Sequence, residues 1–252
     1  MRPIRLLFAA GLAISAVAVG LASASATEQI VGGSRASIAD HQYVVFLSTP
    51  DGFQFCGGTL VADNKVVTAA HCTIRKAPGD VRVVAGREDK TSAEGITSAV
   101  TDIWIHPDYT DVRVGSDVSV LTLDQRLPYT PLGLPDANDA TLYAARTPAT
   151  ILGWGRTAVD GQSSQYLLKA SVPLVADADC VNSYSDYDAK AMVCAGLPDG
   201  GIDTCQGDSG GPLVVNGRLA GLTSWGVGCA APGNPGVYTR LGTYVDLVRS
   251  RL

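Results

Sequence analysis

Short segments rich in β-branched and aromatic residues recur along most of this chain, and turn-forming residues separate them. Val, Ile and Tyr favour extended backbone, whereas Gly, Pro, Asp and Asn mark turns, so the pattern predicts many short strands. Strands at this spacing indicate a sandwich or barrel and argue against βαβ units. The predicted strands cover residues 43–47, 65–68, 81–84, 118–123, 148–152, 170–174, 212–215, 219–224 and 236–239.

Only the C-terminal segment has clear helical spacing. Val245, Val248 and Leu252 fall on one face of a helix that we predict over residues 242–252. A proline-rich connector at 128–136 divides the predicted strands into two sets. The chain is therefore predicted to be all-β with a C-terminal α-helix.

The N-terminus has the features of a secretory signal peptide. Arg2 and Arg5 precede an apolar run over residues 6–21, and small residues follow it. This run is shorter than the ~20 residues that span a bilayer. We therefore predict a signal peptide over residues 1–26, cleaved after Ala26, and a secreted, extracellular product with no membrane association.

Charge and cysteine content restrict the possible partners. The net charge is −5, whereas proteins that bind nucleic acid present basic patches, so we expect no nucleic-acid partner. Six cysteines in an exported chain indicate three disulfides, with many pairings open from sequence alone. Zinc is the competing interpretation, but the chain has no Cys-x-x-Cys pair, and we expect no metal and no cofactor.

Ser209, within Gly-Asp-Ser-Gly-Gly-Pro, is the candidate nucleophile. Flanking glycines let the backbone turn sharply and bring its N–H groups close to the atom that the hydroxyl attacks. A serine hydroxyl is a weak nucleophile and needs a base, together with a group that orients the base. Of the three histidines, His71 within Thr-Ala-Ala-His-Cys is the best placed, and Asp117 lies between it and Ser209 in the sequence.

The order of these three residues separates the hydrolase families. In α/β-hydrolases the acid and the histidine follow the serine, and no histidine follows Ser209. A subtilisin order would need Asp63 as the acid and would leave Asp117 without a role. The remaining order, His71, Asp117, Ser209, resembles the chymotrypsin/trypsin family of serine peptidases. The resemblance is closest to trypsin and extends over residues 30–252.

The resemblance implies a fold of two six-stranded antiparallel β-barrels with the active site between them, over about 30–131 and about 145–240. Ser209 would attack the peptide carbonyl, His71 would transfer the proton, and Asp117 would orient the imidazole. An imidazole suits proton transfer because its ordinary pKa of ~6.5 lies near working pH.

Three further features follow from the same resemblance. The N–H groups of Gly207 and Ser209 would form the oxyanion hole, and Ser224 would hydrogen-bond to Asp117. Ser119 stands where the family usually has alanine. Neighbouring cysteines would pair as Cys56–Cys72, Cys180–Cys194 and Cys205–Cys229.

Specificity is predicted to depend on Asp203, six residues before Ser209. The resemblance places this carboxylate at the base of the primary pocket, where a confined negative charge favours Arg or Lys. Without the family resemblance, Asp203 could equally be a solvent-exposed charge in a loop. The residues predicted to form the pocket are Asp203, Thr204, Ser224, Trp225, Gly226 and Gly236.

Ile30-Val-Gly-Gly matches the N-terminus of the mature family members. There, cleavage frees an α-ammonium that pairs with the aspartate before the nucleophile, Asp208 in this chain. The intact chain is therefore predicted to be a zymogen with a propeptide at 27–29. We expect a monomer that acts on protein and peptide substrates and accepts proteinaceous inhibitors.

The remaining histidines and one acidic cluster receive no role. His106 is predicted to lie in a surface loop, and His41 shows no partner in the sequence. Glu88, Asp89 and Glu94 could hold calcium, but the basic residues Arg87 and Lys90 interrupt this acidic cluster. Calcium binding is therefore left unassigned.

Two other classes of function stay open at this point. A non-catalytic homologue would be compatible with the fold, because a fold does not determine function. Loss of a triad residue would have favoured that hypothesis, and all three are present. An esterase with the same nucleophile is the third hypothesis, which assays with matched peptide and ester substrates would distinguish.

Overall fold

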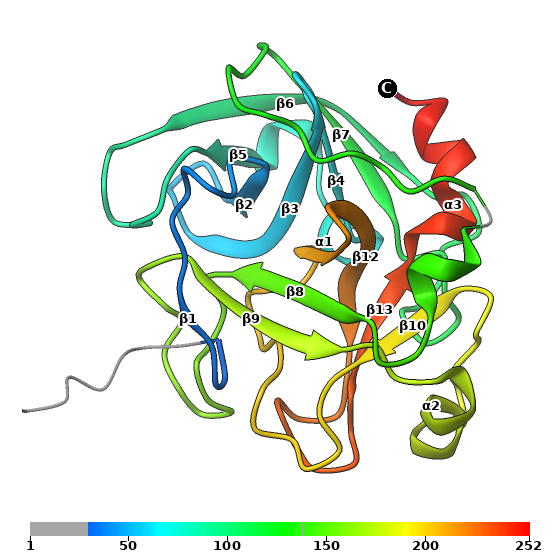
Figure 1. Cartoon of the computed structure of the whole chain (residues 1–252). Helices are drawn as coiled ribbons and strands as arrows, with labels where there is room; N and C mark the ends of the chain where they lie inside the picture. The colour runs from blue at the N-terminus through cyan, green and yellow to red at the C-terminus, as the bar shows by residue number, and fades with distance from the viewer. Residues whose placement is uncertain (1–29, 138) are drawn as a thin grey trace, which may run out of the picture.

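The protein folds into two β-sheet units, one above the other in Figure 1. The computed structural model describes residues 30–137 and 139–252. The predicted signal peptide and residues 27–29 lie outside the described residues. All of the strand pairs within the two sheets are antiparallel, as predicted.

The first unit is a closed barrel of six strands in the order β2-β3-β4-β7-β6-β5. Its apolar residues alternate inward to form one core, which includes Leu47, Leu60 and Leu121. The strands are β2 (Val44–Ser48), β3 (Gln54–Ala62), β4 (Lys65–Thr68), β5 (Arg82–Ala85), β6 (Ile96–Ile105) and β7 (Ser119–Leu123).

The second unit is a curled sheet in the order β1-β9-β8-β11-β12-β13-β10. Beyond the end of β9, a bridge between Leu174 and Ala195 of β10 brings the two sides of the curl together. The predicted two-barrel, all-β fold is thus confirmed, with one additional short strand. The strands are β1 (Ser34–Arg35), β8 (Pro148–Gly153), β9 (Leu168–Pro173), β10 (Met192–Ala195), β11 (Pro212–Val215), β12 (Arg218–Trp225) and β13 (Gly236–Arg240).

The N-terminal residues, which the sequence places with the first barrel, lie against the second. β1 pairs with β9, and Ile30 is fully buried in the core of the second unit. The chain then passes to β2 of the first barrel. The N-terminal segment therefore packs on the second unit, although the chain next enters the first.

Four strands were not predicted from the sequence: β1, β3, β6 and β10. β3 contains Gly57 and Gly58, which weaken a strand prediction. Both glycines are needed for close packing, because a Cβ on Gly58 would lie 2.9 Å from Val66 and one on Gly57 would lie 3.0 Å from Gly211. Contacts with the neighbouring strands override local propensity here.

Three α-helices and two 3₁₀ turns complete the described fold, which contains no helix long and apolar enough to cross a membrane. The C-terminal helix begins at Leu241 and ends at Arg249, so Leu252 lies beyond the helix, 45% exposed, and does not share its face with Val245 and Val248 as predicted. The helices are α1 (Ala70–Thr73), η1 (Pro78–Asp80), η2 (Ala140–Tyr143), α2 (Asp177–Ser183) and α3 (Leu241–Arg249).

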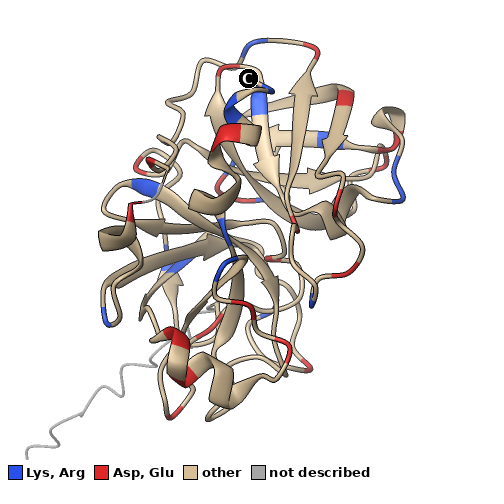
Figure 2. Cartoon of the chain, turned by 90° about the vertical axis from the view of Figure 1, so that its right-hand side faces the viewer, with Lys and Arg blue, Asp and Glu red and all other residues tan. Residues whose placement is uncertain are grey.

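Helix α3 packs where the two units meet. Its buried residues Tyr244, Val245 and Val248 share a cluster with Val120 of β7 and Leu222 of β12. This shared core fixes the two units relative to each other and so fixes any site between them. Figure 2 shows basic and acidic segments interspersed over both units.

Candidate active site

His71 and Asp117 come together because their strands are neighbours. β4 pairs with β7, with Thr68 opposite Ser119, and α1 carries His71 directly after β4. The backbone N–H of His71 donates to Asp117 Oδ1 at 2.8 Å, and the ring Nδ1 lies 2.8 Å from Oδ2. The Asp117 side chain is 1% exposed and that of His71 is 23% exposed.

Asp117 is a buried carboxylate whose oxygens are satisfied by hydrogen bonds. Besides the two donors on His71, Ser224 Oγ donates to Oδ2 at 2.6 Å, as predicted. Thr239 Oγ1 donates to the Asp117 carbonyl at 2.8 Å. A carboxylate at Nδ1 favours the tautomer that carries its proton there, which leaves Nε2 as a hydrogen-bond acceptor.

Over residues 207–211 of the loop that carries Ser209, two N–H groups have no acceptor among the described residues, those of Gly207 and Ser209. The other N–H groups of this segment are hydrogen-bonded within the protein. Those of Asp208, Gly210 and Gly211 donate to the carbonyls of Cys205, Thr223 and Asp208, respectively. Gly207 has φ +100°, a conformation that glycine adopts without strain. The loop can therefore present two backbone donors to one oxyanion.

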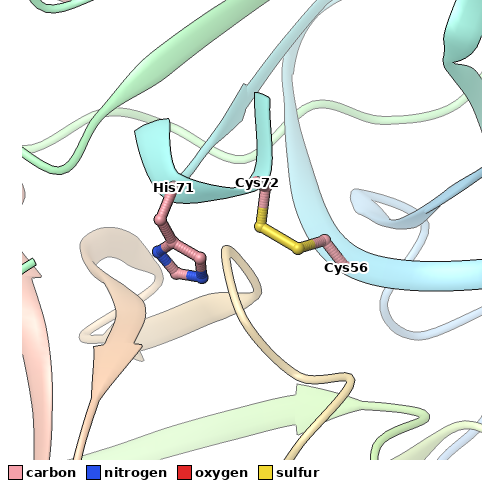
Figure 3. Close-up of side chains that lie close together, drawn as sticks. All are labelled: Cys56, His71 and Cys72. Carbon is pink, nitrogen blue, oxygen red and sulfur yellow. A yellow bond between two sulfur atoms is a disulfide. The ribbon is translucent and has the colours of Figure 1, made fainter. Parts of the chain in front are cut away.

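Ser209 is tied to the first barrel through β3. The N–H of Gly57 donates to the Ser209 carbonyl at 2.7 Å. The neighbouring Cys56 is disulfide-bonded to Cys72, next to His71, as Figure 3 shows. Among the described residues there is no hydrogen bond between the side chains of His71 and Ser209.

A cavity of about 210 Å³ opens beside Ser209 and is lined by residues of the second unit. Asp203, 6% exposed, lies in it and accepts backbone hydrogen bonds from Thr204 at 2.8 Å and Ala230 at 3.2 Å. Burial raises the pKa of Asp203 to about 6, against the opposing effect of those hydrogen bonds. The predicted pocket residues all line this cavity: Asp203, Thr204, Ser224, Trp225, Gly226 and Gly236.

The two wall glycines act differently. A Cβ on Gly236 would lie 2.6 Å from Asp203 Oδ1, so only glycine leaves room for the carboxylate. A Cβ on Gly226 would meet nothing closer than Gly236 at 4.0 Å and would project into open space. Glycine at both positions thus keeps side-chain atoms out of the cavity beside Asp203.

Asp208 lies on the inner side of the Ser209 loop and is fully buried. Its carboxylate accepts hydrogen bonds from the N–H groups of Gly155 at 2.7 Å and Cys205 at 3.0 Å. Burial raises the pKa of Asp208 to about 6, and the hydrogen bonds from Cys205 and Gly155 oppose this. Val31, next to the buried Ile30, forms a bridge with Asp203.

The three predicted disulfides are confirmed: Cys56–Cys72, Cys180–Cys194 and Cys205–Cys229. The sulfurs of Cys56 and Cys72 lie close to His71, but a disulfide has no thiolate to offer a metal. Two carboxylates of the acidic cluster that was left unassigned make contacts within the protein. Glu88 pairs with Arg35 at 3.2 Å, and Asp89 accepts a hydrogen bond from Gln165 at 2.9 Å.

Two of the three histidines differ from the sequence analysis. His106 is buried, 6% exposed, not on the surface, because Trp104 and Tyr244 pack against its ring. Burial lowers the pKa of His106. His41 does have a partner, since its Nδ1 lies 3.0 Å from the hydroxyl of Tyr43.

Several residues that contact the site were not predicted from the sequence. Thr239 and Ala230 contact Asp117 and Asp203 from positions remote in the sequence. Gln54 donates to the Gly207 carbonyl at 3.2 Å. None of them belongs to a motif, and only the proximity of Ala230 to Cys229 gave a usable signal.

Comparison with known proteins identifies the family. The family model described as trypsin matches residues 30–248. The chain belongs to the trypsin family of serine peptidases. It is 55% identical over 223 residues to a trypsin of Saccharopolyspora erythraea, covering 88% of this chain and 98% of that relative.

Relatives from other organisms are similar over nearly the whole chain. Trypsin-1 of Salmo salar is 36% identical, covering 93% of this chain and 95% of the relative. Serine protease 1 of Rattus norvegicus is 35% identical, covering 89% and 90%. This trypsin-family protein is a serine endopeptidase that hydrolyses peptide bonds in proteins and peptides.

Proposed function

We propose that this trypsin-family protein is a secreted endopeptidase that cleaves after Arg or Lys. The observation that carries the proposal is a buried carboxylate, Asp203, in a cavity that borders Ser209. A buried anion without a cationic partner favours a ligand that brings one. The main chain of an arginyl substrate would then lie across Ser209.

In the proposed reaction, Ser209 Oγ attacks the carbonyl carbon while His71 Nε2 takes its proton. The N–H groups of Gly207 and Ser209 bind the oxygen as it becomes negative. The tetrahedral intermediate collapses as His71 protonates the leaving amine, and an acyl-enzyme remains. Water, deprotonated by His71, then releases the acid, while Asp117 stays ionised and stabilises the imidazolium.

The proposal is tested by profiling the matured protein on a random peptide library. Cleavage should occur predominantly after Arg and Lys, because these side chains reach Asp203. Hydrolysis of a matching library of esters, which carry the same side chains, tests the esterase hypothesis. A majority of cleavages after apolar or acidic residues would contradict the proposed specificity.

We also propose that the chain is made as a zymogen, over residues 27–252 after signal cleavage. The α-ammonium of a freed Ile30 would pair with Asp208, which is buried with a raised pKa, and would relieve the cost of its charge. That pairing would order the loop of Ser209. The buried position of Ile30 in the second unit supports this pairing.

Activation by the mature enzyme itself should be slow. The bond to be cut follows Gln29, which is neutral and too short to reach Asp203 well. Purified precursor with a trace of mature enzyme should keep its N-terminus for hours, as followed by N-terminal sequencing and activity. The matched variant Gln29→Arg should convert rapidly, and equally rapid conversion of the wild type would contradict this prediction.

A further inference from the structure

Strand β3 of the first barrel contacts the carbonyl groups of both residues that present unpaired N–H groups. Gly57 donates its N–H to the Ser209 carbonyl at 2.7 Å. Gln54, the first residue of β3, donates its side-chain Nε2 to the Gly207 carbonyl at 3.2 Å. The first of these bonds is a backbone contact, whereas the second depends on one side chain.

The Gln54 amide has its two ends in chemically different surroundings. Its nitrogen faces a carbonyl, which can only accept, and its oxygen lies 3.3 Å from Lys90 Nζ, which can only donate. Lys90 is itself held by Ser163 Oγ at 2.7 Å. These contacts determine the amide orientation and keep its N–H directed at Gly207.

The contact matters because Gly207 is one of the glycines of the loop and has no Cβ to restrict its backbone. With φ +100° and no Cβ, its backbone has alternative conformations that other residues lack. The peptide before it is anchored where the Gln206 carbonyl accepts the Arg156 N–H at 2.8 Å. The peptide after it is anchored at both ends. The Asp208 N–H donates to the Cys205 carbonyl, and Gln54 Nε2 donates to the Gly207 carbonyl.

We propose that Gln54 is a positioning residue that holds the Gly207 N–H in the direction needed to bind the oxyanion. The proposal rests on the proposed peptidase mechanism and adds a residue to it. Gln54 would act in the transition state, when the carbonyl oxygen becomes negative, and not on the arginine side chain in the Asp203 cavity. Its loss should therefore lower kcat and leave KM nearly unchanged.

Two substitutions separate the N–H donor from the rest of the side chain. Gln54→Glu keeps an oxygen for Lys90 and removes the donor, whereas Gln54→Met keeps the volume and removes both polar contacts. Because small displacements at a reacting centre have large effects, kcat should fall about tenfold in both variants. KM for an arginyl peptide should change by less than about twofold, as expected for an interaction made only in the transition state.

Two inhibitors give an independent readout in the matured protein. An arginyl peptide boronic acid forms a tetrahedral adduct with Ser209, and its affinity should fall about as much as kcat/KM. Benzamidine, which would occupy only the Asp203 cavity, should bind the variants and the wild type equally. The control is Gln162→Glu, an exposed glutamine that lines the neighbouring cavity and should leave all constants unchanged.

The outcomes distinguish this inference from the proposed function. Folded Gln54 variants with wild-type kcat and wild-type boronate affinity would overturn the positioning role. Equal losses in boronate and benzamidine affinity would also overturn it, because they would indicate a general disturbance of the site. A matured wild-type protein without peptidase activity would contradict the proposed function and the positioning role together.

Discussion

Replacing Ser209 with alanine should lower kcat for an arginyl peptide by about 10⁶-fold, the order of loss seen when a protease of this chemistry loses its nucleophile. The variant lacks the atom that forms the acyl-enzyme, while the N–H donors and the Asp203 cavity stay in place. Covalent labelling by an organophosphonate should disappear. Steady-state kinetics and mass spectrometry of the labelled protein measure both effects.

The Ser209→Ala variant should keep the fold, because only a hydroxyl is removed and the carbonyl of residue 209 can still accept from Gly57. Its thermal midpoint should lie close to that of the wild type. Ser185→Ala is the matched control, since Ser185 is exposed and its hydroxyl donates to the exposed Asp186. Undiminished turnover in Ser209→Ala would refute the mechanism.

Replacing Asp203 with serine should lower kcat/KM for arginyl and lysyl peptides by about 10⁴-fold, because the substrate cation would enter a buried cavity without its partner. The reaction of Ser209 with a small neutral organophosphonate should be nearly unchanged, because the triad is intact. Asp199→Ser removes an exposed carboxylate from the same loop and should have no such effect. Survival of the preference for Arg would place the recognising carboxylate elsewhere.

The raised pKa of Asp203 adds a pH readout to the same experiment. The carboxyl is ionised above its pKa of about 6 and neutral below it. Benzamidine affinity should therefore be highest above pH 6 and should decline as the pH falls through that value. Asp203→Ser should bind weakly at every pH, without this decline.

Much of the fold and of the site could be predicted from local sequence. Runs such as 65–68 and 212–215 match β4 and β11 without adjustment. The motifs around His71 and Ser209 identified residues that line two cavities of the structure. The cysteine spacing together with the family resemblance gave the correct disulfides. The predictions failed where tertiary contacts determine whether a residue is buried. His106 is an example, because the rings of Trp104 and Tyr244 pack against it.

The sequence by itself determined which chemical groups are available and in what order, because nucleophile, base, acid and pocket carboxylate are residue identities within short motifs. Only the tertiary structure decided how those groups meet. Ser224 contacts Asp117 across 107 positions, and Gln54 contacts Gly207 across 153. Such contacts depend on barrel closure and on the packing of the two units, which local propensity does not encode.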